Sequence, residues 1–366
     1  VAQLAPLFPP EASIRNPLDM IATATAGHYR RALEAVLADP NVDSALALFV
    51  PPLGVRQEDV AEAIVGAAAG HPAKPVLAVL MGRDGLPQGR AELQRARIPA
   101  YVFPESAARA LDALRRQREW RARPALVPPR FAVDTGKASA AVQAARAAGR
   151  RKLSEVEALD LLAAYGVPIA RTRFARQVDD AARAAADVGY PVALKVVSPG
   201  IVHKTDVGGV RTDIGTALEL RAACAEMLEA VTRGAPDAVV DGIVVQQMIR
   251  GGRETIAGFT RDPLFGPLLM FGLGGVYVEA LGDVLFRMAP IHALDAHDML
   301  RGIRAAKILE GVRGAPPVAF AALADVLLRL SQLALDIDAI QELDVNPLLA
   351  FPGGAVAVDA RVLLTG

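Results

Sequence analysis

A lysine and a histidine lie near each other in a segment whose composition suits phosphate chemistry. Lys195 lies in the apolar run 192–197, and His203 follows in the loop 198–210, with Pro199-Gly200 before it and Gly208-Gly209 after it. A lysine in a predicted strand, followed by a mobile loop with a histidine, suggests binding of phosphate groups. The alternative is a lysine whose ammonium extends to the surface and a histidine that only caps a turn.

A second group of polar residues is rich in oxygen ligands. The period of two in a strand places Glu342, Asp344 and Asn346 on one face, while the leucine and valine between them face the core. Asp359 lies in the next predicted strand, 355–361, after a Pro-Gly-Gly turn suited to a hairpin. Carboxylate and amide oxygens that converge across two paired strands suit Mg²⁺, which shares its coordination shell with phosphates. The alternative is the solvated polar face of an edge hairpin.

Two further segments are candidates for contacts with a nucleotide. The apolar strand 243–249 and Glu254 after it would hold a flat base between apolar side chains, with the carboxylate toward a ribose. The loop 271–276 follows another apolar strand, and its glycines let backbone N–H groups approach phosphates closely. The alternatives are a core strand with its turn and an ordinary tight turn.

Composition limits the classes of function. The 366 residues are 52% hydrophobic and 22% charged, which predicts a globular protein of two or three domains. A formal net charge of zero argues against binding of nucleic acid or an anionic membrane surface. Cys224 is the single cysteine, so an internal disulfide is excluded and a cytoplasmic location is expected. The longest uncharged stretch, 263–278, contains proline and glycine residues and is short for a membrane span.

The first part of the chain predicts a parallel α/β domain. Short apolar runs that read as strands occupy 43–50, 75–81 and 98–103. Helical patterns occupy 28–38, 57–69 and 104–119. Strands that are apolar on both faces and alternate with helices indicate a parallel sheet. We expect this domain over 1–123, truncated at its N-terminus, because the start lacks both an initiator methionine and a signal-peptide pattern.

The second part predicts an α+β domain over 151–366, after a proline-rich linker and helix at 124–150. The expected strands are 191–198, 207–214, 242–249, 254–260, 266–272, 284–291, 340–349 and 354–363. Many of them are joined by short, turn-like connections, which favours largely antiparallel sheets.

Three strings carry a resemblance to a known family. They read PVALKVVSPGIVHKTDVGGV (191–210), DPLFGPLLMFGLGG (262–275) and ELDVNPLL (342–349). Together they resemble the ATP-grasp domain of NDP-forming acyl-CoA synthetases, the ADP-forming acetate–CoA ligase group. The strings NPLD (16–19) and IPAY (98–101) resemble the flavodoxin-like ligase domain that precedes ATP-grasp in fused members. The resemblance implies a partial flavodoxin-like parallel α/β domain followed by an α+β ATP-grasp domain.

The resemblance implies a role in nucleotide binding for several residues. Lys195 would bind the nucleotide phosphates. The hinge against adenine would be formed by Gln246, Gln247 and Met248. Glu254 would lie nearby.

It also implies the residues that act on phosphate. Asn346 and Asp359 would ligate Mg²⁺ bound with ATP or ADP, and Asp344 would help to orient a phosphohistidine. His203 would be the histidine that carries phosphate within the ATP-grasp half.

The resulting hypothesis is the phosphoryl-transfer part of an ADP-forming acyl-CoA synthetase. Carboxylic acid and CoA would bind to domains that have no counterpart in this sequence, so turnover by this chain alone is not expected. A homo- or hetero-oligomer is expected. The alternative is a non-catalytic half of a protein acyltransferase that senses nucleotide or acyl-CoA, and a third is a structural assembly domain.

Overall fold

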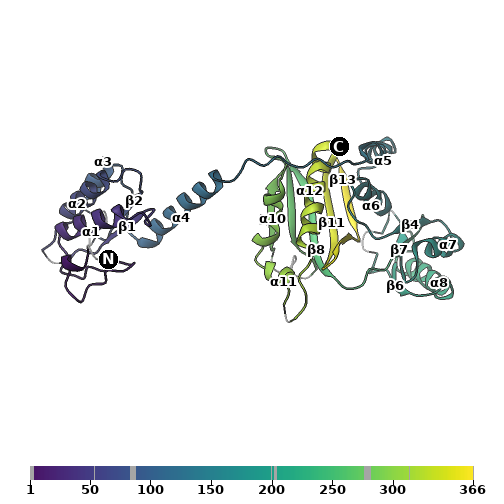
Figure 1. Ribbon diagram of the computed structural model, residues 1–366. Helices are drawn as coiled ribbons and strands as arrows, with labels where there is room; N and C mark the ends of the chain where they lie inside the picture. The colour runs from purple at the N-terminus through teal and green to yellow at the C-terminus, as the bar shows by residue number, and fades with distance from the viewer. Residues whose placement is uncertain are drawn as a thin grey trace. The chain divides into compact units, whose positions relative to one another are not determined.

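The computed structural model describes residues 4–52, 54–82, 88–198, 200–201, 204–275, 282–312 and 314–365 (Figure 1). Contacts divide the chain into a unit of residues 1–125 and a unit of residues 126–366. The domain bounds expected from the sequence remain a prediction. Across the described ranges, no helix is both long and apolar enough to span a bilayer.

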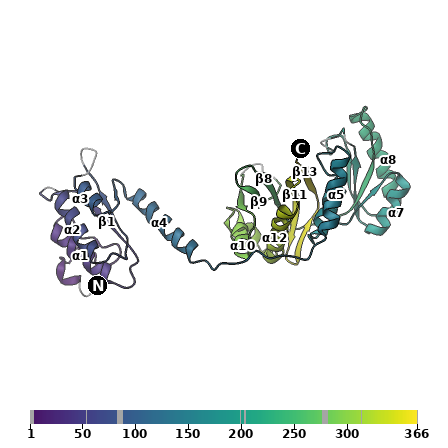
Figure 2. The same ribbon diagram turned by 90° about the horizontal axis from the view of Figure 1, so that it is seen from above.

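The first unit is built on a small parallel sheet. Its strands pair in the order β1 (Ala45–Phe49), β2 (Val76–Leu80) and β3 (Ala100–Tyr101). Its helices, after a short 3-10 turn at Ala5–Leu7, are α1 (Ala26–Ala38), α2 (Gln57–Ala69), α3 (Arg90–Arg95) and α4 (Pro104–Arg121). Figure 2 shows β1 between α1 to α3 on one side and α4 on the other. Every residue of β2 is buried, as a central strand covered on both faces requires.

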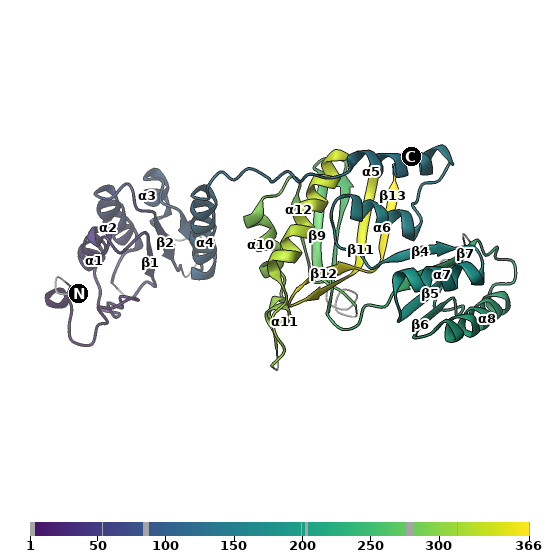
Figure 3. The same ribbon diagram turned by 45° about the vertical axis from the view of Figure 1, so that its right-hand side comes forward.

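The second unit contains a four-stranded antiparallel sheet. Its order is β4 (Thr172–Ala175), β7 (Gly242–Gln247), β5 (Val192–Val197) and β6 (Val210–Ile214). Helices α7 (Val178–Val188) and α8 (Ala217–Gly234) share a core with this sheet, as Figure 3 shows. The strand β4 is absent from the sequence-based expectation, because its four residues, Thr-Arg-Phe-Ala, show no run or alternation of apolar residues that would predict a strand.

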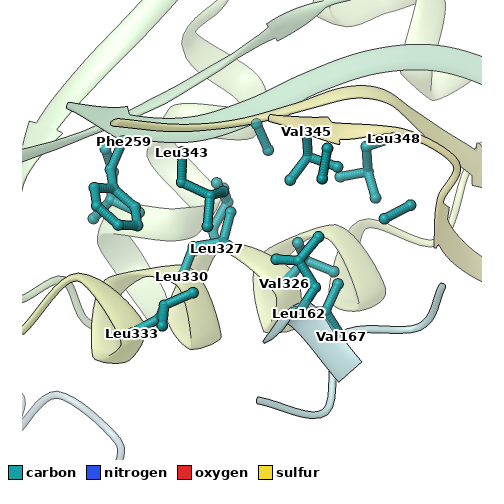
Figure 4. Packing of buried hydrophobic residues seen from close by; sticks show 14 of the residues in the cluster. Leu162, Val167, Phe259, Val326, Leu327, Leu330, Leu333, Leu343, Val345 and Leu348 are labelled. Atoms are coloured by element: carbon teal, nitrogen blue, oxygen red, sulfur yellow. The ribbon is translucent and has the colours of Figure 1, made fainter. Parts of the chain in front are cut away.

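A larger antiparallel sheet completes the second unit. Its order is β10 (Val284–Met288), β9 (Gly266–Leu273), β8 (Arg253–Asp262), β11 (Ile340–Phe351) and β12 (Gly354–Ala357), and β13 (Ala360–Leu364) also pairs with β11. The helices in its core are α5 (Thr135–Ala147), α6 (Glu155–Ala164), α10 (Ala293–Gly302), α11 (Ala306–Glu310) and α12 (Phe320–Asp336). Figure 4 shows Leu327 and Leu330 of α12 facing Leu343 of β11. The helix α5 lies inside the segment expected as linker and helix, and it packs on α6 in this core.

The predicted strand 354–363 is wrong as a single element, and so is its inner part 355–361. It forms two strands, of which β12 pairs with 348–351 and β13 pairs with 340–345 of β11. The register of β11 against β8 also shifts between Val345 and Leu348. Pro347 lies in that interval and has no N–H to donate, so the ladder cannot continue through it. Because β12 ends at Ala357 and β13 begins at Ala360, Asp359 lies between these two strands.

Candidate functional site

Lys195 lies in the middle of β5, as the sequence predicts. Its neighbours across the sheet are Val244 of β7 and Val210 of β6, so Lys195 extends from a strand that is paired on both sides. The side chain is 14% exposed, and its ammonium forms an ion pair with Glu155. The same ammonium lies 3.9 Å from Oδ2 of Asp359. The structure therefore brings together a lysine and a carboxylate from distant parts of the sequence.

The sequence does not predict Glu155 as a residue of the site. It is the first residue of α6, directly after Ser154, whose hydroxyl accepts a hydrogen bond from the N–H of Glu157 while the Glu157 carboxylate accepts one from the N–H of Ser154. Oε2 of Glu155 pairs with Nζ of Lys204 at 2.9 Å, and Oε1 pairs with Lys195. The Ser-x-x-Glu spacing of this capping box is a signal in the sequence that locates the helix start, but it does not predict the two lysines.

Opposing effects act on the Glu155 carboxyl. Burial alone would raise its pKa, but the charges of Lys195 and Lys204 and their hydrogen bonds outweigh burial and lower it below the ordinary value. The side chain is 10% exposed. Glu155 is thus a buried carboxylate that stays ionised because it has two cationic partners.

The backbones of the expected magnesium ligands, Asn346 and Asp359, meet where the pairing of β11 with its neighbours shifts. The N–H of Asn346 donates to the carbonyl oxygen of Asp359 at 3.1 Å, and the N–H of Val358 donates to the carbonyl oxygen of Pro347 at 3.0 Å. Oδ1 of Asp359 accepts from the N–H of Ala360 at 2.8 Å, which orients the carboxylate. Partial burial, followed by the charge of Glu155, raises the pKa of Asp359. Asn346 itself is exposed.

Asp344 lies on the same strand, opposite Gly258 of β8 and Arg361 of β13. Burial, followed by the charge of Glu342, raises its pKa to about 6. Its Oδ1 is buried and has no hydrogen-bond partner among the described residues. A buried acceptor without a partner is open to a hydrogen-bond donor or a cation that a ligand brings to it.

The number of ligands suits a cation that shares its shell with a substrate. In the described ranges, no three histidine, cysteine, aspartate or glutamate side chains are grouped as a closed metal site would need. Mg²⁺ commonly takes one or two protein ligands and completes its shell with phosphates and water. The residues present fit that arrangement.

The expected hinge segment is largely occupied by internal hydrogen bonds. The buried amide of Gln246 donates to Oγ1 of Thr172 at 3.0 Å and to the carbonyl oxygen of Val358 at 2.8 Å, so it joins the two sheets. The backbone N–H of Gln247 donates to Arg171, and that of Met248 donates to Pro191. A base held here would therefore use carbonyl oxygens or the Met248 side chain rather than these N–H groups.

Glu254 lies beside the start of the glycine loop. The N–H of Gly274 donates to the carbonyl oxygen of Glu254 at 2.8 Å. A Cβ on Gly275 would lie 2.6 Å from Oε2 of Glu254, and the φ of +63° at this position favours glycine. Val276, the last residue of the predicted loop 271–276, lies outside the described residues, and so does His203. Lys204, next to His203, is described.

Residues 144–364 match the family described as the ATP-grasp domain. The chain is therefore an ATP-grasp protein, whose second unit holds the candidate site between its two antiparallel sheets. The beta subunit of acetate–CoA ligase [ADP-forming] I from Pyrococcus furiosus is 45% identical over 217 residues, which are 59% of this chain and 94% of that subunit. The chain belongs to the family of ADP-forming acetate–CoA ligases.

A longer relative and a solved structure agree with this assignment. Acetate–CoA ligase [ADP-forming] I from Archaeoglobus fulgidus is 38% identical over 365 residues, which cover 100% of this chain and 52% of that protein. The chain thus spans about half the length of the curated relatives it matches. Acetyl-coenzyme A synthetase 1 from Ca. Korarchaeum cryptofilum, in complex with coenzyme A, Ca-AMPCP and HgCl+, has a TM-score of 0.60 at 42% identity and covers 61% of this chain and 98% of that one.

Another complex of that synthetase contains coenzyme A and Mg-AMPPCP, with a phosphohistidine segment pointing towards the nucleotide binding site. It has a TM-score of 0.57 at 38% identity, covering 62% of this chain and 100% of that chain. The predicted family and fold class are confirmed. Because these relatives are ligases, the regulatory alternative is not favoured.

Proposed function

We propose that this chain is the nucleotide-binding, phosphoryl-transfer part of an ADP-forming acyl-CoA synthetase. The overall reaction would convert acid, CoA and ATP to acyl-CoA, ADP and phosphate through a phosphohistidine. The observation that carries the proposal is the 3.9 Å approach of the Lys195 ammonium to Oδ2 of Asp359. This approach places a cation that suits phosphate groups beside a carboxylate that suits Mg²⁺.

The roles follow from the chemistry of each group. Lys195 would offset negative charge on the phosphates, and Asn346 and Asp359 would hold Mg²⁺. When bound, Mg²⁺ would supply charge neutralisation across the phosphate oxygens. Asp344, with its unpaired oxygen, would accept a hydrogen bond from the ring of a phosphohistidine and so orient it.

The base and ribose contacts are also proposals. Gln246, Gln247 and Met248 line the end of β7, where Gln246 would hold the segment in place through its buried amide while Met248 contacts the base. Glu254, exposed beside Gly274, would face the ribose.

His203 would carry the phosphoryl group within this half of the enzyme. A neutral imidazole is a competent nucleophile toward a phosphoryl group. Carboxylic acid and CoA would bind to the part of the relatives that this chain does not match, and an oligomer would unite the parts. The buried single cysteine, Cys224, supports a cytoplasmic location.

Nucleotide binding tests the proposal directly. Titration calorimetry with ADP and ATP should give dissociation constants in the micromolar to millimolar range, stronger with Mg²⁺ than without it. The double replacement Asn346→Ala and Asp359→Ala should remove most of the magnesium dependence. Arg221→Ala, which breaks a surface ion pair with Asp179, should leave it unchanged. Failure of the intact chain to bind either nucleotide would contradict the proposal.

A further inference from the structure

Four charged side chains from four elements meet at the candidate site. Lys195 comes from β5, Lys204 from the turn before β6, and Glu155 from the start of α6. Asp359 comes from the break between β12 and β13. We call these residues the charge quartet. Each lysine pairs with one oxygen of Glu155, and Lys195 also approaches Asp359.

The charge quartet has no net charge, because two cations face two anions. A site that binds phosphates by charge alone would present a cationic surplus. The Glu155 side chain is only 10% exposed at the first turn of a helix, and each of its oxygens has an ammonium partner. Its negative charge is therefore a fixed part of the site.

We propose that Glu155 makes nucleotide binding depend on a divalent cation, so that metal-free nucleotide is rejected. The inference rests on the proposed function of the site. Metal-free ADP carries about three negative charges and its magnesium complex about one, so the carboxylate repels the free form more strongly. The two lysines do not overcome this repulsion, because Glu155 and Asp359 already balance them.

A structural role for Glu155 predicts a different result. The residue joins α6, in the core of the larger sheet, to β5 of the smaller sheet. If it served only to hold these elements together, its replacement would weaken binding of both nucleotide forms. The two roles are therefore separated by the ratio of the two dissociation constants.

The test uses Glu155→Gln in the full 366-residue chain, with ADP titrated once in EDTA and once in excess Mg²⁺. A unit charge a few ångström away changes affinity at a partly buried site by about tenfold or more. We expect metal-free ADP to bind at least about tenfold more tightly than to the parent, and Mg–ADP to change by less than about threefold. The matched control is Glu157→Gln, on the same turn but outside the charge quartet, which should leave the ratio unchanged.

A compensating variant tests charge rather than shape. Glu155→Gln combined with Lys204→Gln returns the site to zero net charge, and it should restore the parental ratio. If Glu155→Gln does not fold, as judged by circular dichroism, Lys204→Gln alone decides the matter: it should weaken metal-free ADP more than Mg–ADP. An unchanged ratio in the folded single variants, or equal weakening of both forms, overturns the inference. A parent that binds neither form contradicts the proposed function instead.

Discussion

At the scale of the residue, ion pairs decide what the titratable groups can do. Lys195 and Lys204 share one buried carboxylate, and burial, followed by the charge of that carboxylate, raises the pKa of Asp359. Asp344 is different, because burial and Glu342 raise its pKa while one oxygen has no described partner. The site thus contains one carboxylate with two cationic partners and another that is open to a ligand.

His203 provides the residue-scale prediction about phosphate. Incubation of the chain with radiolabelled ATP and Mg²⁺, or with ADP and a phosphorylated partner domain, should give acid-labile, base-stable phosphate on His203, because a neutral imidazole is a competent nucleophile. Peptide mapping locates the label. Equal labelling of His203→Ala, or label on His292 or His297, would show that the assignment is incorrect.

Glu157 provides a prediction about pH and stability. Hydrogen bonds from Arg150 at 2.7 and 2.8 Å, followed by one from the N–H of Ser154, lower its pKa to about 2. A lowered folded-state pKa stabilises the protein above the ordinary glutamate pKa of 4.5, and this contribution is lost as the pH falls toward 2.

Urea unfolding of the parent and of Glu157→Gln measures this contribution. We expect the variant to lose about 1 kcal/mol at pH 7, less than the full shift implies because the side chain is 31% exposed. The difference from the parent should shrink between pH 4.5 and pH 3. A difference that is constant with pH would assign the loss to helix capping alone.

At the scale of the element, close packing of β8 against β11 positions the acidic residues. Gly258 lies opposite Asp344, and a Cβ built on it would be 2.1 Å from the carbonyl oxygen of Leu343. The clash is with backbone, which cannot turn aside. Glycine at this position allows the two strands to pair at the distance that the ladder needs.

Gly258→Ala should therefore destabilise the second unit. We expect a loss of about 2–4 kcal/mol in the free energy of unfolding, measured by urea denaturation, since the strands must separate to admit the methyl group. Gly353→Ala is the matched control, because a Cβ there has no heavy atom within 4 Å. Equal stability of the two variants would show that β8 and β11 have room to adjust.

At the scale of the whole molecule, the chain joins a parallel α/β unit to an ATP-grasp unit and spans about half of its longer relatives. The same family includes a protein divided into subunits, whose beta subunit matches this chain over 94% of its length. A division of the reaction between polypeptides is therefore compatible with the family.

The purified chain should form no CoA thioester from acid, CoA and ATP. The reason is that groups for CoA and acid are expected in the part of the relatives that it does not match. A coupled assay for CoA consumption or thioester formation measures this, and addition of that part as a separate polypeptide should restore activity. Steady turnover by the chain alone would contradict the division of roles.

The sequence by itself determined those features that depend on local pattern. The alternation around Asp344 predicts Leu343 and Val345 in the core, and both are buried. The apolar run around Lys195 predicts the strand β5, because an extended chain buried on both sides needs consecutive apolar residues. Repeated apolar strands and turn residues likewise predict the parallel sheet and the antiparallel sheets.

Only the tertiary structure decided which distant groups meet. Glu155 has no chemical motif of its own, and it becomes part of the site because α6 packs where two lysines converge. The break between β12 and β13, which leaves Asp359 near Lys195, arises from pairing with two different parts of β11. Such contacts depend on packing between elements far apart in the chain, and the local periodicity of the sequence does not predict them.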